Sequence, residues 1–376
     1  MLKKPQECEG CVLSAAPPSG WGFVPADGSG SNGVLLLFEA AGESEQKTGR
    51  PLTGAAGFLF QQLLGRARLK RDDFRIHNVL SCRPPDNKLR GMPYEQEAIS
   101  RCSVHLNRTL AERRWGCIVA GGDVALHTLL PEVDASLTAC RGYVFESSES
   151  DGRIAPRTPI LPTFHPSYLQ RGQMALSAVV IYDLLRAVEI AKEGYQEVDL
   201  SHFLLDPPPQ EMAEWVRQFE IAAACGDVWL SADIETPEKG HDEEELLCGA
   251  GTVAGYPILR CGYSWAAGQN VLSAPWGGSF DHLHRRLLAH RGAKIFWNAP
   301  FDIGELARAG ATVNGPIHDG MVMWHLLNSD LRKGLGFVAT FYCKGLPRWK
   351  HLAATEPAQY NAVDAYAADV IVTSGM

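Results

Sequence analysis

Short apolar runs alternate with amphipathic stretches over residues 33–192 of the chain. Runs such as GVLLLF, FRIHNVL, CIVAGG and TPILPTF have the length of buried strands, and stretches such as YEQEAISRCSVHLNRTLAERR have helical spacing. Strands that alternate with helices of this length predict a parallel sheet that is covered on both faces. Ligands of such sheets bind at the carboxyl ends of the strands, so the loops after the apolar runs are the places to look for chemistry.

A charged and proline-rich passage, EGYQEVDLSHFLLDPPPQ, ends this alternation. It is followed by a helical stretch, EMAEWVRQFEIAAA, by three strand-like runs and then mostly by helices. A chain of 376 residues also exceeds the size, roughly 250–300 residues, at which a single core usually stops growing. We therefore predict two domains, residues 1–196 and 197–376.

Composition and charge narrow the class of protein only slightly. The chain is 45% hydrophobic and 21% charged, which is typical of a soluble globular protein. Its formal charge of −8 argues against binding to DNA or to an anionic membrane through overall electrostatic attraction, although a local basic face is compatible with this charge. No apolar run approaches the roughly 20 residues of a membrane span, and the start MLKKPQECEGC lacks the apolar core of a signal peptide. We expect a cytoplasmic protein without a membrane partner.

Acidic residues form an ordered set in the second predicted domain. Asp233 and Glu235 stand two apart at the end of an apolar strand, so both side chains project to one face, where they repel unless a cation lies between them. Asp302 follows in KIFWNAPFD, where a strand gives way to a helix. Tyr360 and Asp364 are neighbours on one helical face. Each feature alone also fits a solvated strand end, a helix cap or an ordinary amphipathic surface.

Together, D-x-E, N-x-x-F-D and Y-x-x-x-D resemble the motifs of 3′→5′ proofreading exonucleases of the RNase H-like superfamily, specifically the domain next to family A DNA polymerases. The resemblance implies an RNase H-like α/β domain with a mixed sheet, a DNA 3′ end as substrate, a polymerase domain or subunit as partner, and Tyr360 as the residue that orients the attacking water. Two divalent ions roughly 3.5–4 Å apart activate that water and stabilise the leaving oxygen. By the resemblance, the ligands of these Mg²⁺ or Mn²⁺ ions are Asp233, Glu235, Asp302 and Asp364.

Cysteines in the first predicted domain suggest a second kind of metal site. Cys8 and Cys11 form a C-x-x-C pair, and Cys82 and Cys102 follow later in the chain. A cytosolic protein with ten cysteines is unlikely to use them as a disulfide framework, which favours metal ligands. Spacing alone fits both zinc and a [4Fe–4S] cluster.

Three segments behind the C-x-x-C pair, ESEQKTGRPLTGAAGFLFQQLL, HNVLSCRPPDN and LPTFHPSYLQRG, resemble the family 4 (iron–sulfur) uracil-DNA glycosylases. The resemblance covers about residues 5–192 and implies a three-layer αβα sandwich with a mainly parallel sheet. It also implies a structural [4Fe–4S] cluster on the four cysteines. Such an enzyme turns a base out of the DNA stack and reads its edge in a closed pocket.

The resemblance assigns roles to single residues. Asn78 would form paired hydrogen bonds with the uracil edge, and His165 would contact uracil O2 and stabilise the negative charge of the departing base. Glu39 would lie beside the pocket and disfavour the methyl group of thymine, with Glu45 as a second acid near it. PSYLQRG would enter the duplex as an apolar wedge. Without the resemblance, Asn78 is a strand-end turn residue and His165 a loop histidine.

The opening loop departs from the family pattern at four positions. Phe38 stands for a glycine, Ala41 for a proline, Gln46 for an acid, and Leu52 for the aromatic residue that stacks on uracil. Base stacking on an aromatic ring contributes roughly 1–3 kcal/mol, and its loss from a transition state would lower the rate roughly 5- to 150-fold. The leading hypothesis is a DNA repair and replication protein with a glycosylase and an exonuclease. Its rivals are a glycosylase-like module that only binds DNA or senses uracil, and two zinc-stabilised domains without catalysis.

Overall fold

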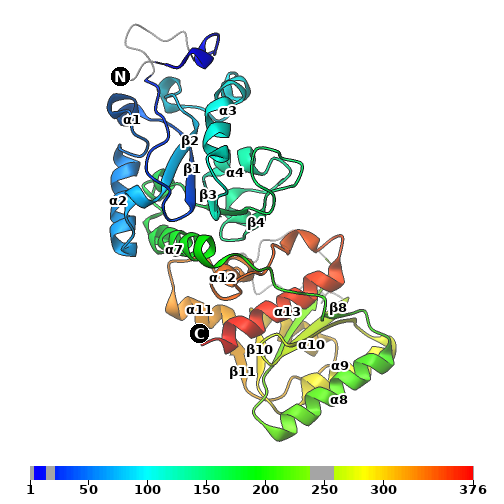
Figure 1. Ribbon diagram of the computed structural model, residues 1–376. Coiled ribbons are helices and arrows are strands. Elements are labelled where there is room, and N and C mark those ends of the chain that lie inside the picture. The colour runs from blue at the N-terminus through cyan, green and yellow to red at the C-terminus, as the bar shows by residue number, and fades with distance from the viewer. Residues whose placement is uncertain (1–3, 14–21, 238–257, 376) are drawn as a thin grey trace. The chain divides into compact units, whose positions relative to one another are not determined.

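The computed structural model describes residues 4–13, 22–237 and 258–375 (Figure 1). The chain divides into two compact units, Met1–Gln196 and Glu197–Met376. None of the helices in these described ranges is long and apolar enough to cross a membrane.

A five-stranded sheet of order β2-β1-β3-β5-β4 forms the centre of the first unit (Figure 1). Four of its strands are parallel, and only the short β4 runs antiparallel to its neighbour β5. The mainly parallel sheet that the alternation predicts is therefore confirmed. The strands are β1 (Val34–Ala40), β2 (Arg75–Leu80), β3 (Cys117–Gly121), β4 (Phe145–Glu146) and β5 (Pro159–Thr163).

Helices cover both faces of this sheet, which confirms the three-layer arrangement. One layer is formed by α2 and α7, with α7 packed on β1, β3 and β5, and the other by α3 and α4, which pack on β1, β2 and β3. The buried pair Arg141 and Asp183 ties the segment before β4 to α7. The helices are α1 (Glu43–Thr48), α2 (Ala55–Ala67), α3 (Glu95–Ala111), α4 (Asp123–Leu129), α5 (Leu137–Cys140), α6 (Pro166–Leu169) and α7 (Ser177–Glu193).

The second unit has a six-stranded mixed sheet of order β11-β10-β7-β8-β9-β6. Strands β7, β8 and β9 form an antiparallel meander, and β10 and β11 extend it in parallel on the other side of β7. This order is that of the RNase H-like fold and confirms the expected mixed sheet. The strands are β6 (Leu204–Leu205), β7 (Leu230–Glu235), β8 (Arg260–Trp265), β9 (Asn270–Pro275), β10 (Lys294–Phe296) and β11 (Ile317–Asp319).

One helix of the second unit, α13, is buried along almost its whole length and packs across β7, β8, β9 and β10. Such burial explains its composition, because a helix with apolar residues on nearly every side has to lie inside the protein. Helices α8, α9 and α10 contribute to an apolar core built on the same strands. The helices are α8 (Pro209–Cys225), α9 (Asp281–Ala289), α10 (Ala299–Arg308), α11 (Gly320–Leu327), α12 (Leu335–Tyr342) and α13 (Pro357–Thr373).

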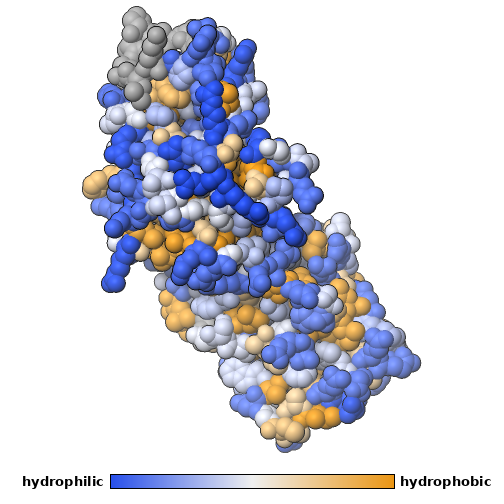
Figure 2. All heavy atoms as spheres, viewed as in Figure 1, coloured by the Kyte–Doolittle hydropathy of each residue, from blue (hydrophilic) through white to orange (hydrophobic). Residues whose placement is uncertain are grey.

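Short 3-10 turns carry two of the residues discussed below, Cys8 and Lys350. Hydrophilic residues cover much of the first unit on the face shown in Figure 2, with smaller hydrophobic areas between them. In the second unit, α11 exposes the large apolar side chains of Val322, Leu326 and Leu327. The turns are η1 (Gln6–Cys8), η2 (Arg71–Asp73), η3 (Pro85–Asn87), η4 (Met174–Leu176), η6 (Gly278–Phe280) and η7 (Lys350–Leu352).

Candidate active sites

The four cysteines predicted as ligands line one small cavity of about 20 Å³ in the first unit. Cys8 and Cys11 come from the N-terminal segment, Cys82 follows β2, and Cys102 lies on α3. Segments far apart in the sequence therefore bring these four sulfur atoms to one place. Lys4 and Arg101 line the same cavity and add positive charge to its wall.

Burial controls the protonation state of these cysteine thiols. Burial raises the pKa of the Cys82 thiol to about 12 and also raises the pKa of Cys8 and Cys102, so a bound cationic group is needed to hold them as thiolates.

Glu39 and His165 lie together at the carboxyl ends of the parallel strands. Glu39 is near the end of β1, and His165 follows β5 as the N-cap residue of α6. Both line two adjoining cavities of about 340 Å³ each, and Glu45 lines one of the two. Asn78 and Leu52 line neither cavity among those found in the described residues. The structure thus brings three of the five predicted pocket residues to one opening.

A hydrogen bond fixes the tautomer of the neutral His165 ring. The backbone N–H of Ser167 donates to His165 Nδ1 at 3.0 Å, so the proton of the neutral ring is on Nε2. Burial, and after it the charge of Arg171, lowers the pKa of His165 to about 4, which keeps the ring neutral near pH 7. Burial also raises the pKa of Glu39, with Glu95 as the next cause. The site therefore offers a neutral N–H donor on His165 beside the Glu39 carboxyl group, whose pKa is raised.

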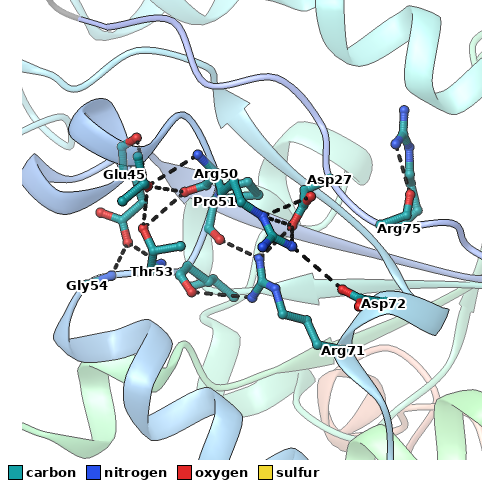
Figure 3. A network of polar contacts seen from close by, with 12 residues as sticks. Asp27, Glu45, Arg50, Pro51, Thr53, Gly54, Arg71, Asp72 and Arg75 are labelled. Carbon is teal, nitrogen blue, oxygen red and sulfur yellow. Dashed lines mark hydrogen bonds and ion pairs between the residues drawn. The ribbon is translucent and has the colours of Figure 1, made fainter. Parts of the chain in front are cut away.

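Glu45 organises the loop that surrounds this opening (Figure 3). Its Oε1 accepts hydrogen bonds from the backbone N–H groups of Thr53 at 2.8 Å and Gly54 at 2.7 Å. Its Oε2 accepts from the N–H of Gly42 at 3.1 Å. The side chain is only 8% exposed. One carboxylate thus ties the segment after β1 to the start of α2 and gives the loop its shape.

Asp27 and Arg71 support the same loop, and sequence reasoning missed both (Figure 3). Asp27 accepts from Arg50 Nη2 at 2.9 Å and from Arg71 Nη2 at 3.1 Å. Arg71 also donates to the carbonyl oxygens of Pro51 and Leu52, at 2.5 and 3.3 Å. These bonds hold Leu52 at φ +49°, a backbone conformation that residues other than glycine rarely adopt. Only the Arg-Pro pair in the loop offered a sequence signal for this network.

Phe38 fills space beside the pocket residues. Its ring meets the rings of His165 and Phe60 edge to face, with centroids 5.3 and 5.8 Å apart. A Cβ added at Gly121 would lie 2.4 Å from the Phe38 ring, so the ring is closely packed against that strand. Phe38 is also the register partner of Asn78, which places both side chains on one face of the sheet. Phe38 therefore occupies the region next to two polar residues that the resemblance assigns to base recognition.

Three acids of the second unit come close enough to share a cation. Asp233 and Glu235 from β7 and Asp364 from α13 offer carboxylate oxygens that all lie within 4.8 Å of one another. Burial, and then the charge of Asp364, raises the pKa of Glu235 to about 8 and that of Asp233 well above its usual range. Like charges held this close favour a bound cation, and oxygen ligands suit Mg²⁺ or Mn²⁺.

Asp302 lies beside this trio on α10. Its Oδ1 accepts a hydrogen bond from the backbone N–H of Ile234 at 3.2 Å, and Ile234 separates the two acids of β7. Burial raises the pKa of Asp302 well above its usual range. Oδ2, the second carboxylate oxygen of Asp302, takes no part in this hydrogen bond. The fourth predicted acid therefore reaches the same strand but is not part of the closest group of three.

Asn361 holds Asp233 in place, and sequence reasoning missed it. Its Nδ2 donates to Asp233 Oδ2 at 2.8 Å and to the Asp233 carbonyl at 3.2 Å, and its Oδ1 accepts from Ser273 Oγ at 2.7 Å. A Cβ at Gly262 would lie 2.6 Å from the Asn361 carbonyl oxygen, so the glycine permits this close approach. The sequence signal that could have indicated Asn361 was its position next to Tyr360, in a helix of mostly small apolar residues.

A tryptophan and a lysine converge on the last acid. Trp349 Nε1 donates to Asp364 Oδ1 at 2.7 Å, and Lys350 Nζ lies 2.9 and 3.0 Å from the two Asp364 oxygens. Lys350 Nζ also donates to the Tyr360 hydroxyl at 3.1 Å. Burial, and next the charge of Asp364, raises the pKa of Tyr360 above its ordinary value, so the phenol keeps its proton. The Tyr360–Asp364 pair is therefore part of a polar network.

Comparison with known proteins identifies the first unit. The family model of the uracil DNA glycosylase superfamily matches residues 25–188. The type-4 uracil-DNA glycosylase of Thermotoga maritima is 33% identical over 191 residues, which are 50% of this chain and 92% of that protein. This chain belongs to the uracil DNA glycosylase superfamily. A second type-4 relative of this superfamily member, from Sulfurisphaera tokodaii, is 32% identical over 170 residues, 43% of this chain and 70% of that protein.

Among solved structures, Trypanosoma brucei RNase D in complex with RNA U12 is similar to this superfamily member at 17% sequence identity and a TM-score of 0.34. The match covers 48% of this chain and 62% of the RNase D chain, which is less than two thirds of it. The fold of the second unit is established by its own strand order, given above.

Proposed function

We propose that this protein removes uracil from DNA with its first unit and shortens DNA from the 3′ end with its second. The observation that supports the exonuclease most directly is the group of Asp233, Glu235 and Asp364, whose oxygens lie within 4.8 Å of one another. The placement of Glu39 and His165 at two shared cavities supports the glycosylase. Frayed or single-stranded DNA would be the common substrate.

In the first unit, the proposed chemistry rests on the neutral His165 ring. Its Nε2–H would donate to O2 of a uracil turned out of the helix and stabilise the charge that develops as the base departs. Glu39 would lie beside C5 of the base and disfavour the methyl group of thymine. Asn78 would read the uracil edge from the neighbouring strand. The cysteine cavity would hold a [4Fe–4S] cluster as a structural support, with Cys8, Cys11, Cys82 and Cys102 as ligands.

In the second unit, the acids would bind two divalent ions. Ions at this position would supply an activated water and stabilise the leaving 3′ oxygen of a phosphodiester. Asn361 fixes the orientation of Asp233, and Asp302 adds an oxygen beside β7. Tyr360, which keeps its proton, would orient the attacking water. We further propose, from the motif resemblance, that a DNA polymerase domain or subunit supplies the mispaired 3′ ends.

A second candidate function for the first unit follows from Phe38 and Leu52. Leu52 is 6% exposed and lines neither cavity, so it offers a flipped base little stacking surface. The Phe38 ring lies against His165 and takes up room near the base-reading residues. Both features favour a unit that binds uracil-containing DNA and excises the base slowly or not at all.

One assay separates these two functions. A single-stranded oligonucleotide with one uracil is incubated with the protein in EDTA, which silences the exonuclease, and abasic sites are then cleaved with alkali. Breaks at uracil that disappear in His165→Ala but persist in His127→Ala, an exposed histidine of the same unit, would establish excision. Tight binding without breaks would establish the sensor, and Phe38→Gly should then restore some cleavage. If the protein neither binds the oligonucleotide nor produces breaks, both functions are refuted.

The exonuclease is tested with a 5′-labelled oligonucleotide and Mg²⁺. The wild-type chain should produce a ladder of products that shorten from the 3′ end. Asp233→Ala should abolish the ladder, whereas Asp227→Ala, an exposed acid just before β7, should leave it unchanged. Digestion by the Asp233→Ala variant at the wild-type rate would refute the proposed role of the acids.

A further inference from the structure

Lys350 lies inside the acid site of the second unit, where no motif placed it. It begins the short turn η7, and its ammonium group lies 2.9 and 3.0 Å from the two oxygens of Asp364. The same group donates to the Tyr360 hydroxyl at 3.1 Å and lies 4.9 Å from the centre of the Tyr360 ring. Lys350 therefore connects an acid proposed to bind metal with the residue proposed to orient water.

The hydrogen bonds to Asp364 limit how that carboxylate can bind a cation. A carboxylate has about four acceptor positions on its two oxygens. Trp349 and Lys350 both reach Oδ1, at 2.7 and 2.9 Å, and Lys350 also reaches Oδ2 at 3.0 Å. Two of these positions, one on each oxygen, therefore accept hydrogen bonds from nitrogen donors, and the ammonium group also lies in ion-pair contact with Oδ1. A divalent ion that bound Asp364 through both oxygens would have to displace the ammonium group.

The contact with Tyr360 fixes the direction of its hydrogen bond. A lysine ammonium has three donors and no acceptor, so the Tyr360 oxygen must accept from it. The phenolic proton is then left to donate elsewhere, for example to the oxygen of a water molecule. Without Lys350, the same hydroxyl could rotate and present either its proton or its lone pair.

We propose that Lys350 is a positioning residue of the exonuclease site: its ammonium group competes with a divalent ion for Asp364 and makes Tyr360 a hydrogen-bond donor. This inference rests on the proposed exonuclease function. It predicts that the site binds divalent ions less tightly than its acids alone would, and that binding the ion shifts Lys350 away from at least one Asp364 oxygen.

The competition is tested by titrating the full-length protein with Mn²⁺ and following free Mn²⁺ by electron paramagnetic resonance. Lys350→Gln should bind Mn²⁺ about tenfold more tightly than wild type, equivalent to about 1.4 kcal/mol. Lys350→Arg, which keeps the charge, should stay within about twofold. Lys344→Gln, an exposed lysine of the same unit, should not change the affinity. Equal or weaker Mn²⁺ binding by a folded Lys350→Gln variant would overturn the inference.

The role at Tyr360 predicts a second effect in the opposite direction. At saturating Mn²⁺, Lys350→Gln should trim 3′ ends at least about tenfold more slowly, because the Tyr360 hydroxyl is no longer fixed. A residue that only stabilised the fold would not tighten metal binding while slowing turnover. If the glutamine variant does not fold, Lys350→Met keeps the apolar stem, and Mn²⁺ should raise its melting temperature more than that of wild type. An equal rise would also overturn the inference.

Asp233→Asn distinguishes failure of this inference from failure of the proposed function. If wild type and Asp233→Asn bind Mn²⁺ equally, the acids do not form a metal site and the exonuclease proposal fails with everything built on it. If Asp233→Asn weakens binding and Lys350→Gln leaves it unchanged, the metal site stands and only the role of Lys350 is wrong.

Discussion

Replacing Glu45 by glutamine should loosen the loop around the proposed uracil pocket. The carboxylate accepts three backbone hydrogen bonds, from Thr53 and Gly54 on Oε1 and from Gly42 on Oε2. A glutamine side chain has one oxygen and one NH₂ group, so it can accept at only one of these two positions. The best orientation keeps the two bonds on the Oε1 side and turns the NH₂ group toward the N–H of Gly42.

The expected loss follows from this count. One charge-assisted hydrogen bond disappears, two donors come to face each other, and the two remaining bonds become neutral. Hydrogen bonds to charged groups contribute about 1.5–3 kcal/mol each, and an unsatisfied buried donor costs a similar amount. We therefore expect Glu45→Gln to destabilise the loop by about 2–4 kcal/mol. The loss should appear locally, because the bonds connect only the segment after β1 with the start of α2.

Hydrogen exchange of peptides that cover residues 42–54 measures this effect directly. A loss of 2 kcal/mol or more should speed exchange of the protected amides by about 30-fold or more. Glu43→Gln is the matched control, because that carboxylate is 56% exposed and pairs with Lys47 on the surface, where such pairs contribute about 0.3–0.5 kcal/mol. Equal protection in the two variants would refute the view that Glu45 holds the loop.

Three further predictions address the two units separately. Asn361→Ala should weaken Mn²⁺ binding about tenfold in the same titration, because Asp233 loses the two N–H bonds that orient it. Asp183→Asn should lower the free energy of unfolding of the first unit by about 3–5 kcal/mol in calorimetry, because Arg141 would stay buried without its carboxylate. The His165 ring should titrate near pH 4 by NMR. Its pKa lies below the ordinary 6.5, so its contribution to stability is present above pH 6.5 and is lost as the pH falls toward 4. A midpoint near 6.5 would contradict the buried, neutral ring.

The parallel sheet of the first unit and the shared face of Asp233 and Glu235 could be predicted from local sequence patterns, whereas the mixed sheet of the second unit and the full set of acids were predicted from the motif resemblance. Alternating apolar runs and helical stretches specify a mainly parallel sheet, and strand ends on such a sheet meet at one edge. Asp233 and Glu235 project to one face because they stand two apart on β7, and Asp364 follows on a helix that packs against that strand. The convergence of the four cysteines was also predicted only from a family resemblance, because no local pattern connects positions nearly one hundred residues apart.

The supporting residues could not be predicted because their roles depend on tertiary packing. Lys350 and Asn361 belong to no motif, and each acquires its role only when α13 packs against η7 and β7. Asp27 and Arg71 form a loop support between segments that are separated by more than forty residues. The sequence showed that Leu52 differs from the family aromatic, but only the backbone shows that it is buried at positive φ.

The partners of a carboxylate, rather than its motif, distinguish a structural acid from a metal ligand in this protein. Glu45 receives three backbone N–H donors, which satisfy its charge and leave it little capacity for a cation. Asp233 and Glu235 lie close to each other and to Asp364, and burial, followed by the charge of Asp364, raises the pKa of both. Asp364 is intermediate, because Trp349 and Lys350 satisfy part of its charge. An acid whose charge is partly satisfied binds a cation less tightly than one without such donors. We therefore expect Lys350, which donates to Asp364, to determine the metal affinity of the site.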